Sequence, residues 1–190
     1  MNEQDKRLII AITGASGAVY GIRSLQILRA AGVETHLVIS AAAALTIPQE
    51  TAWSVAQVLE LASFTYSDSD TGARIASGSF AANGMLIAPC SIKTLSAVAN
   101  SACDTLIARA ADVCLKEGRP LLLAVRETPL HRGHLHLMDL AARAGAVIFP
   151  PVPAFYGQPQ TLQDVIDASV GRMLARLGIE NELYPRWNGL

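Results

Sequence analysis

Charged residues are scarce in this 190-residue sequence. Asp, Glu, Lys and Arg make up 16% of the chain and hydrophobic residues 51%, whereas an average globular protein is roughly 25% charged. With so little charge to cover a surface, we expect part of the exterior to be buried in contacts between subunits. The net charge is −1, whereas nucleic-acid-binding proteins usually carry an excess of basic residues. No nucleic-acid partner is therefore expected.

Cysteines and long apolar runs are also scarce. The three cysteines form no C-x-x-C pair, which favours free thiols in a reducing cytoplasm over a disulfide framework or a zinc site. No apolar run approaches the roughly 20 residues of a membrane span, and the run after residues 1–7 is too short for a secretory signal. We therefore expect a cytoplasmic protein with no membrane partner.

The length favours one domain over residues 1–190, because a chain of this size can bury a single large core. Residues 1–7 would form an N-terminal extension and residues 178–190 a C-terminal tail. The tail carries the aromatic and basic segment Tyr184-Pro185-Arg186-Trp187, which we interpret as a candidate docking segment for a neighbouring subunit.

The chain is organised around the stretch Leu8–Gly21. An apolar run, Leu8–Ile12, predicts a buried strand, and helical spacing predicts a helix over Ala18–Ala31. The small residues Thr13–Gly17 join them in a turn that would gather backbone N–H groups and the positive helix end, an arrangement suited to a phosphate. The turn matches neither the Rossmann nor the Walker A glycine pattern, so an ordinary tight strand–helix turn is an equal alternative.

Further strands alternate with helices along the rest of the chain. This alternation predicts an α/β fold, a doubly wound (Rossmann/flavodoxin-like) three-layer sandwich with a mainly parallel sheet. The later strands are predicted at Glu34–Ser40, Met85–Ala88, Leu121–Val125 and Ala146–Phe149. The later helices are predicted in the alanine-rich segment after Ser40 as far as Pro48, over Ser54–Ala62, from Ser91 to about Ala99, from Ala102 to about Glu117, and after Thr161. The start at Ala102 is predicted because Ser101-x-x-Asp104 fits a capping box.

Polar residues follow several of these strands, at the sheet edge where open α/β folds bind ligands. Ser40 follows one strand, Ser91 and Thr94 follow another, and Arg126-Glu127 follows a third. The hydroxyl groups could bind an anion together with first-turn amides, although helix capping explains both serines equally well. A guanidinium can bind phosphate and a carboxylate can move protons. The sequence therefore predicts a site for a phosphorylated ligand.

Arg109 and Lys116 are seven residues apart, on one face of a predicted helix that also carries Asp112. One interpretation is a basic face directed at a phosphate. The other is a solvent-exposed string of ion pairs, Arg109–Asp112–Lys116. The sequence does not decide between them.

Two groups of residues raise the question of a metal. Asp68 and Asp70 form a D-x-D pair that could hold a divalent cation, but short acidic loops are usually solvated turns. His131, His134 and His136 lie close in sequence, yet on a helix His136 would point about 160° away from His134. No carboxylate lies at the spacing from these histidines that zinc proteases of the zincin type use. We therefore expect no metal.

Six segments, in this order, resemble the UbiX-type flavin prenyltransferases, and the resemblance runs from about Leu8 to Trp187. They are Thr13–Gly17 (TGASG), Ser77–Phe80 (SGSF), Pro89–Leu95 (PCSIKTL), Arg109–Glu117 (RAADVCLKE), Pro120–Leu130 (PLLLAVRETPL) and Val152–Pro159 (VPAFYGQP). The resemblance implies a metal-independent transfer of a dimethylallyl group from dimethylallyl monophosphate to N5 and then C6 of reduced FMN. It leaves the preference for monophosphate over diphosphate open.

The resemblance also implies partners. The product, prenylated FMN, would serve a UbiD-type decarboxylase in ubiquinone biosynthesis or aromatic-acid decarboxylation, and a flavin reductase would supply reduced FMN. The chain itself would form a homo-oligomer, a dodecamer in this family, with sites assembled from more than one subunit.

Site residues follow from the matching motifs. The FMN-binding positions implied are Gly14, Ala15, Ser16, Ser40, Ser91, Ile92, Lys93, Thr94 and Arg126. The dimethylallyl phosphate positions implied are Arg109, Lys116, Tyr156 and Arg172. Catalytic roles are implied for Ser16 near flavin N5, for Glu127 in proton handling, and for Lys116, Tyr156 and Arg172 at the phosphate. Either Tyr66 or Trp187 would supply an aromatic wall of the prenyl pocket.

Three other interpretations compete with this one. Flavin-dependent cysteine decarboxylases are a related family, but their P-x-M-N-x-x-M-W signature is absent from the sequence. A non-catalytic FMN carrier, or an accessory subunit of a decarboxylase, would not need Lys116, Glu127, Tyr156 and Arg172 together. Direct decarboxylation of an aromatic acid would need a separate acid pocket, for which the sequence offers no candidate.

Overall fold

The computed structural model describes residues 6–187 and 189, and its centre is one sheet of six parallel strands. The strands lie in the order β3-β2-β1-β4-β5-β6, the Rossmann order. Their bounds are β1 (Arg7–Ile12), β2 (Glu34–Ile39), β3 (Phe64–Ser67), β4 (Gly84–Cys90), β5 (Leu121–Val125) and β6 (Val147–Ile148). The predicted doubly wound α/β sandwich is confirmed.

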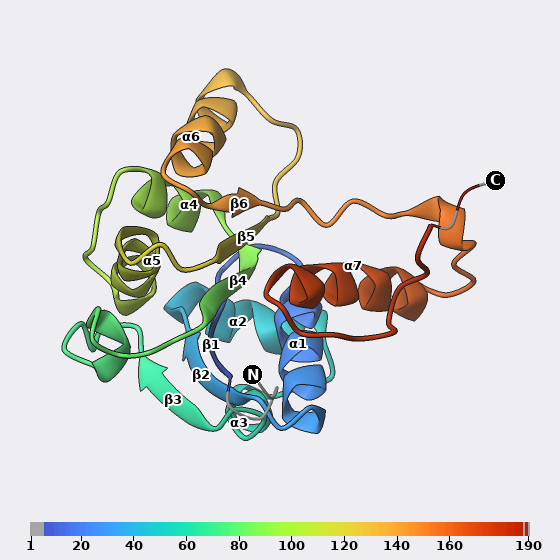
Figure 1. Ribbon diagram of the computed structural model, residues 1–190, viewed down its shortest axis with the longest axis horizontal. Coiled ribbons are helices and arrows are strands. Elements are labelled where there is room, and N and C mark those ends of the chain that lie inside the picture. Colours follow the sequence, from blue (N-terminus) through green and yellow to red (C-terminus); the bar gives the residue numbers. More distant parts are fainter. Residues whose placement is uncertain (1–5, 188, 190) are drawn as a thin grey trace.

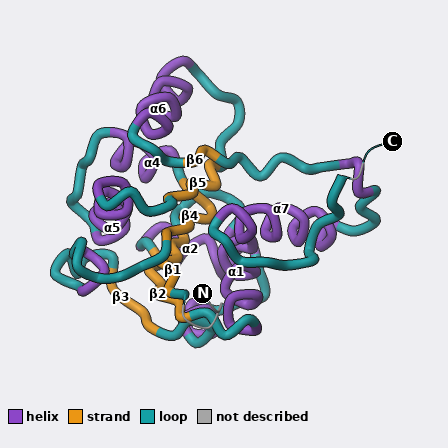
Figure 2. The backbone as a smooth tube through the Cα atoms, viewed as in Figure 1, coloured by secondary structure: helices purple, strands orange, loops and turns teal. Residues whose placement is uncertain are grey.

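Helices cover both faces of the sheet, with the strands running between them (Figures 1 and 2). The helices are α1 (Ala18–Ala30), α2 (Ala41–Glu50), α3 (Val55–Leu59), α4 (Ile92–Ala99), α5 (Leu106–Lys116), α6 (Arg132–Arg143) and α7 (Leu162–Arg176), with short 3-10 helices η2 (Arg74–Ala76) and η3 (Phe155–Gly157). One buried cluster joins the sheet to α1, α2, α3 and α7. A second joins the other face to η2, α4, α5 and α6.

The strands form where the sequence has apolar, β-branched runs, since a parallel sheet covered on both faces buries its strands completely. All seven residues of β4 and all five of β5 are buried. The one strand the sequence analysis did not predict, β3, lies at the sheet edge and is mostly exposed. Its pattern is therefore too polar to stand out as a strand.

Several helix boundaries differ from the prediction. Helix α3 ends at Leu59, not at Ala62. Helix α2 continues through Pro48 to Glu50, although a proline beyond the first turn removes one backbone hydrogen bond of the helix. Helix α5 begins after Thr105, not at Ala102. Ser101 adopts a positive φ of 52°, so the predicted Ser101–Asp104 capping box is wrong. The amide of Ile107 donates instead to the Asp68 carboxylate at 3.0 Å.

The order of the strands places a switch point between β1 and β4, because chain connections leave these neighbours in opposite directions. Open α/β sheets bind ligands just beyond the carboxyl ends of such strands. The turns that follow β1 and β4, Thr13–Gly17 and Ser91–Thr94, therefore flank the expected binding position. No helix among the described residues is both long and apolar enough to cross a lipid bilayer.

Candidate active site

The turns after β1, β4 and β5 are tied together at the switch point. Thr13 Oγ1 donates to the Pro89 carbonyl at 2.7 Å and accepts from the Ser91 amide at 2.9 Å. The Arg126 amide donates to the Cys90 carbonyl at 3.1 Å, and Arg126 Nε donates to the Ser16 carbonyl at 3.2 Å. Residues from three strand ends thus form one rigid edge, as their sequence positions predicted.

The turn after β1 requires its glycines. A Cβ at Gly14 would overlap the Cβ of Ala42 on α2, and Gly17 has a φ of +110° that other residues rarely adopt. The amides of Gly17 and Ala18, at the start of α1, both donate to Glu50 Oε2, at 2.8 and 3.3 Å. These two amides therefore hold a carboxylate of the chain itself rather than being open to a phosphate.

Sequence reasoning missed Glu50 altogether. It lies 33 residues after Gly17, beyond the proline at which the helix was expected to stop. Nothing in the local sequence signals the contact, because it depends on how α2 packs beside α1.

The start of α4 offers a more open set of donors. Ser91 caps the helix, with Oγ accepting from the Thr94 amide at 3.3 Å and lying 3.1 Å from Thr94 Oγ1. Within the described part of the chain, the first-turn amides of Ile92 and Lys93 have no acceptor. Two hydroxyls and two amides at a helix start suit an anionic group.

Arg126 and Glu127 leave the end of β5 side by side. Only Nε of the Arg126 guanidinium has a partner in residues 6–187, so its terminal nitrogens are available to a ligand. Glu127 is exposed and accepts only from the amide of Thr128, at 3.0 Å. Ser40, after β2, caps α2 by accepting from the Ala43 amide at 3.2 Å. Together with α4, these groups place N–H and O–H donors and one carboxylate acceptor after the ends of β2, β4 and β5.

Arg109 and Lys116 lie near opposite ends of α5. Arg109 pairs with Asp112 at 3.5 Å, so the first half of the predicted ion-pair string is present. Lys116 pairs instead with its neighbour Glu117, and this lysine holds the pKa of the exposed Glu117 carboxyl below its usual value. Gly78 lies directly against the side chains of Lys116 and Glu117, since a Cβ at Gly78 would overlap both.

Tyr156 and Arg172 meet in a second place. They line a cavity of about 180 Å³ between η3, α7 and the tail, together with Phe149, Val152, Ala154, Ala168, Ser169, Tyr184 and Pro185. The Tyr156 hydroxyl donates to the Pro185 carbonyl at 3.3 Å, and the Arg172 guanidinium lies 5.6 Å over the Tyr184 ring. The described part of the tail therefore packs on α7 of its own chain.

Of the two aromatic-wall candidates, Trp187 lies beside this cavity, with its ring 5.8 Å from that of Tyr156 in a T-shaped contact. Tyr66 lies elsewhere, with its hydroxyl bonded to His36 and Arg74. The geometry favours Trp187.

The predicted phosphate-binding residues do not converge within one chain. Lys116 belongs to a helix on one face of the sheet and Arg172 to a helix on the other. Figure 1 shows α5 and α7 on opposite sides of the strands. The α5 residues and the Tyr156–Arg172 pair are thus two separate half-sites.

Two of the metal candidates, Asp68 and His131, bond to backbone amides at helix starts. Asp68 caps α5. His131 caps α6 by accepting from the Gly133 amide at 3.0 Å, and its ring is 3.6 Å from that of His134. Across the residues that the structure describes, no group of three or more His, Cys, Asp and Glu side chains is arranged to hold a metal ion.

Comparison with known proteins identifies the family. A family model described as flavoprotein matches residues 1–174. The flavin prenyltransferase UbiX of Escherichia coli (strain K12) is 56% identical over 187 residues, which are 97% of this chain and 99% of that protein.

Two solved structures agree with this match. AnUbiX (PadA1) in complex with FMN and dimethylallyl pyrophosphate has a TM-score of 0.95 and 50% identity, covering 97% of this chain and 98% of that one. A dodecameric FMN-dependent Ubix-like decarboxylase from Escherichia coli O157:H7 has a TM-score of 0.93 and 46% identity, covering 96% and 100%. The chain therefore belongs to the UbiX-type flavin prenyltransferases.

Proposed function

We propose that this chain transfers a dimethylallyl group from dimethylallyl monophosphate to N5 and C6 of reduced FMN, without a metal. The observation that carries the proposal is the match over nearly the full length to a structure that holds FMN and dimethylallyl pyrophosphate. When bound in its reduced form, FMN supplies the two nucleophilic atoms. The protein's own residues bind, orient and handle protons.

FMN binding is assigned to the rigid edge formed by the turns after β1, β2, β4 and β5. The α4 amides and the hydroxyls of Ser91 and Thr94 offer hydrogen bonds to an anionic group, and Arg126 adds a guanidinium beside the Ser16 turn. The FMN-binding set proposed is Gly14, Ala15, Ser16, Ser40, Ser91, Ile92, Lys93, Thr94 and Arg126. In this set Ser16 would stand near flavin N5.

Breaking the allylic C–O bond leaves charge on the departing phosphate, which must be stabilised without a metal. Arg109, Lys116 and Arg172 carry fixed positive charge, and the Tyr156 hydroxyl can donate a hydrogen bond. Trp187 beside Tyr156 offers an aromatic face for the positive allyl group. These are the residues we assign to the dimethylallyl phosphate site.

Ring closure at flavin C6 releases a proton, so a base is needed nearby. We assign it to Glu127, the exposed carboxylate that follows Arg126 at the end of β5. Its only partner within residues 6–187 is a neighbouring backbone amide, so the carboxylate is free to turn toward a bound ligand.

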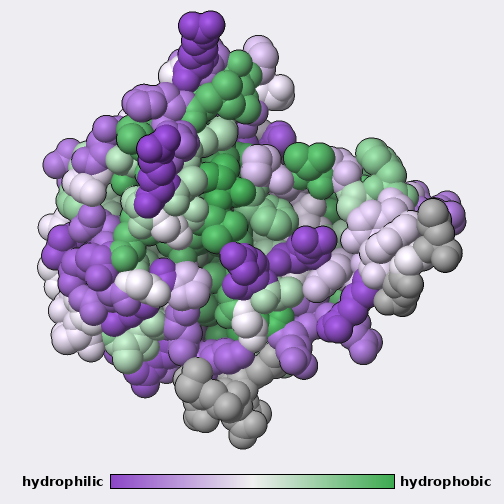
Figure 3. Space-filling view, turned by 45° about the horizontal axis from the view of Figure 1, so that its top comes forward, coloured by the Kyte–Doolittle hydropathy of each residue, from purple (hydrophilic) through white to green (hydrophobic). Residues whose placement is uncertain are grey.

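The active site would be assembled between copies of the chain, because its two half-sites lie on opposite faces of one sheet. Apolar side chains are exposed where a second copy could pack. Figure 3 shows apolar residues gathered in the middle of one face, between the part that carries α6 and the arm that carries α7. Val152, Phe155 and Leu162 are each more than 70% exposed. A homo-oligomer agrees with the dodecameric relative.

Residues 1–190 would act as one flavin-binding domain, since a single sheet runs through the described part. Residues 1–5, most of the proposed N-terminal extension, lie outside the described residues, as do 188 and 190 of the tail. The chain would work in the cytoplasm, where its free cysteines stay reduced. A flavin reductase would supply its FMN, and a UbiD-type decarboxylase would take its product.

The test mixes the purified protein with FMN, dithionite and dimethylallyl monophosphate in the presence of a chelator. Mass spectrometry of the acid-released flavin should show FMN carrying one added C5 unit. Glu127→Gln should bind FMN but form little product, because the proton acceptor is lost. Arg172→Ala should raise KM for dimethylallyl monophosphate and lower the rate, because a phosphate-binding charge is lost.

Flavin that stays bound without gaining mass would contradict the proposal and favour a carrier or accessory subunit. Dimethylallyl diphosphate in a parallel reaction measures the preference between the two phosphates. A peptide that ends in cysteine, mixed with the protein and oxidised FMN without dithionite, tests the cysteine decarboxylase alternative, since oxidation of the thiol would reduce the flavin and the peptide would lose CO₂.

A further inference from the structure

A fully buried histidine outside the proposed active site has both ring nitrogens bonded. The His36 side chain, on β2, is 0% exposed. Its Nε2 lies 2.8 Å from Glu34 Oε1, and its Nδ1 lies 2.9 Å from the Tyr66 hydroxyl. Breaking either hydrogen bond would cost free energy, because it would leave a buried polar group unsatisfied.

The neighbours fix the direction of these bonds. Glu34 can only accept as a carboxylate, so His36 Nε2 carries the proton, and a neutral Nδ1 accepts from the Tyr66 hydroxyl. The Tyr66 oxygen in turn accepts from Arg74 Nε at 2.7 Å, and Arg7 Nε lies 3.1 Å from Glu34 Oε1. The result is a chain of hydrogen bonds in which Arg74 donates to Tyr66, Tyr66 to His36 and His36 to Glu34. Arg7 forms an ion pair with Glu34 at its end.

Ring contacts connect this chain of hydrogen bonds to the loop before β4. The His36 ring stacks on Phe64 at 5.0 Å and meets Phe80 edge to face at 4.8 Å. The Arg74 guanidinium lies 4.1 Å over Phe64 and 5.4 Å from the Phe80 ring centre. Phe80 is therefore held from two sides, and with it the loop Ser77–Phe80.

This loop is the surface against which the end of α5 rests. The Arg119 guanidinium donates to the carbonyls of Gly78 and Phe80, each at 2.6 Å. Gly78 is so close to the Lys116 ammonium that a Cβ there would lie 2.7 Å from Nζ. The loop therefore packs against the Lys116 ammonium, and a shift of the loop would change the space in which this side chain lies.

We propose that His36 is a positioning residue for the prenyl-phosphate site: through Tyr66 and Phe80 it holds the loop Ser77–Phe80 in place, and the loop holds Lys116. The role of Lys116 at the phosphate rests on the proposed function, whereas the hold on the loop does not. His36 does not touch the flavin edge, so its effect falls on the prenyl donor.

Two substitutions break the same hydrogen bond from opposite ends. His36→Phe keeps a ring but loses Nδ1, and Tyr66→Phe keeps its ring but loses the hydroxyl. Each should raise KM for dimethylallyl monophosphate about tenfold and change kcat and the Kd of FMN by less than about twofold. The double variant should be no worse than the more affected single variant, because both remove one link. His136→Phe, the same change at an exposed site on α6, is the control.

Hydrogen–deuterium exchange gives a readout independent of activity. In both single variants the amides of residues 77–82 and 116–119 should exchange faster, while those of the Thr13–Gly17 turn should not change. Unchanged exchange in the loop, an unchanged KM, or penalties that add in the double variant would each overturn the proposal. If the unsubstituted protein transfers no C5 unit, the proposed function fails, while exchange still decides whether His36 holds the loop.

Discussion

Single residues at the edge of the sheet cap helices at positions that we also propose for the ligand. Ser40 and Ser91 cap helices and are also assigned to FMN, so the capping and ligand interpretations of the sequence are compatible. Their placement was predictable because polar residues directly after buried strands share one edge of a parallel sheet. The Glu50 contact with α1 was not predictable, since it joins residues that only helix packing brings together.

The buried His36 predicts a pH dependence of stability. Burial is the main cause that lowers its pKa below the ordinary 6.5, and the hydrogen bond that His36 donates to Glu34 opposes the shift. Between these two pKa values the unfolded chain binds more protons than the folded one, so the free energy of unfolding decreases as the pH falls below 6.5. Above 6.5 this residue contributes no pH dependence.

Urea unfolding at pH values from 8 to 5 would measure this effect. The exposed carboxyls of Glu117 and Asp164, whose pKa values are lowered by Lys116 and by backbone amides, titrate below this range. His36→Phe should therefore lose part of the decrease seen in the unsubstituted protein. An identical pH dependence in both proteins would contradict a neutral, buried His36.

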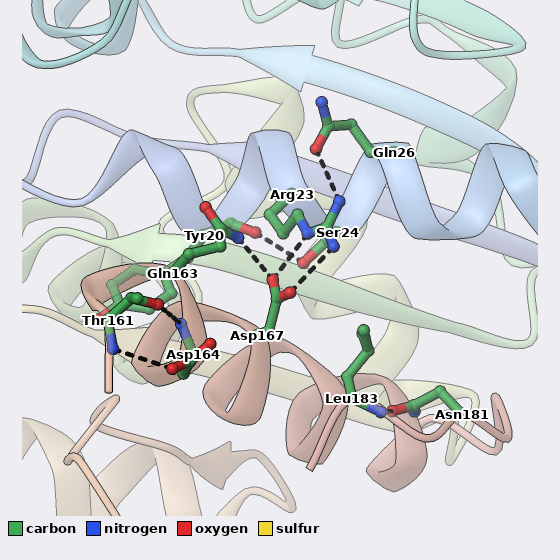
Figure 4. A network of polar contacts seen from close by, with 10 residues as sticks. All are labelled: Tyr20, Arg23, Ser24, Gln26, Thr161, Gln163, Asp164, Asp167, Asn181 and Leu183. Atoms are coloured by element: carbon green, nitrogen blue, oxygen red, sulfur yellow. Dashed lines mark hydrogen bonds and ion pairs between the residues drawn. The ribbon is translucent and has the colours of Figure 1, made fainter. Parts of the chain in front are cut away.

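At the scale of elements, a bidentate ion pair joins α7 to α1 (Figure 4). Arg23 Nε and NH2 donate to the two Asp167 oxygens at 2.7 and 3.0 Å, and the hydrogen bond with Asp167 raises the pKa of Arg23. Both side chains are less than a third exposed. Helix α7 also carries Arg172, so this pair anchors one half-site to the sheet.

Asp167→Ala should lower the free energy of unfolding by about 1–2 kcal/mol, because it leaves a partly buried guanidinium without its bidentate partner. Thermal unfolding at one fixed protein concentration measures this. Asp139→Ala is the matched control, since Asp139 pairs with Arg143 at 2.8 Å on an exposed helix face and should cost less than about 0.5 kcal/mol. Equal losses in both variants would contradict the anchoring role.

The element boundaries show where sequence reasoning stops. Buried strands such as β5 were predicted residue for residue, because continuous apolar runs mark strands covered on both faces. Edge strand β3 was missed because it is mostly exposed. Helix α5 starts after a local cap, Thr105, whose side chain accepts from the Ala108 amide at 3.3 Å. The added contact with Asp68, which lies 39 residues before Ile107, is one that no local pattern contains.

At the scale of the whole molecule, the low charge content matches a large exposed apolar surface. Phe155 is 73% exposed on the projecting segment between β6 and α7. Phe155→Asp should therefore weaken assembly without unfolding the chain, because an added charge would have to be buried between copies. Sedimentation velocity should show a smaller species, while Phe155→Tyr should assemble normally. An intact assembly of Phe155→Asp would mean that this face lies outside the interface.

Above all, we expect flavin prenylation to take place in a site that two copies of the chain complete. The most direct test unfolds Lys116→Ala and Arg172→Ala proteins together in equal amounts, refolds the mixture, and measures the C5 unit gained by FMN. Each variant alone should form little product, while the mixture should regain about a quarter of full activity, the random fraction of sites with both intact halves. A mixture as inactive as the separate variants, when refolded unsubstituted protein is active, would contradict the claim.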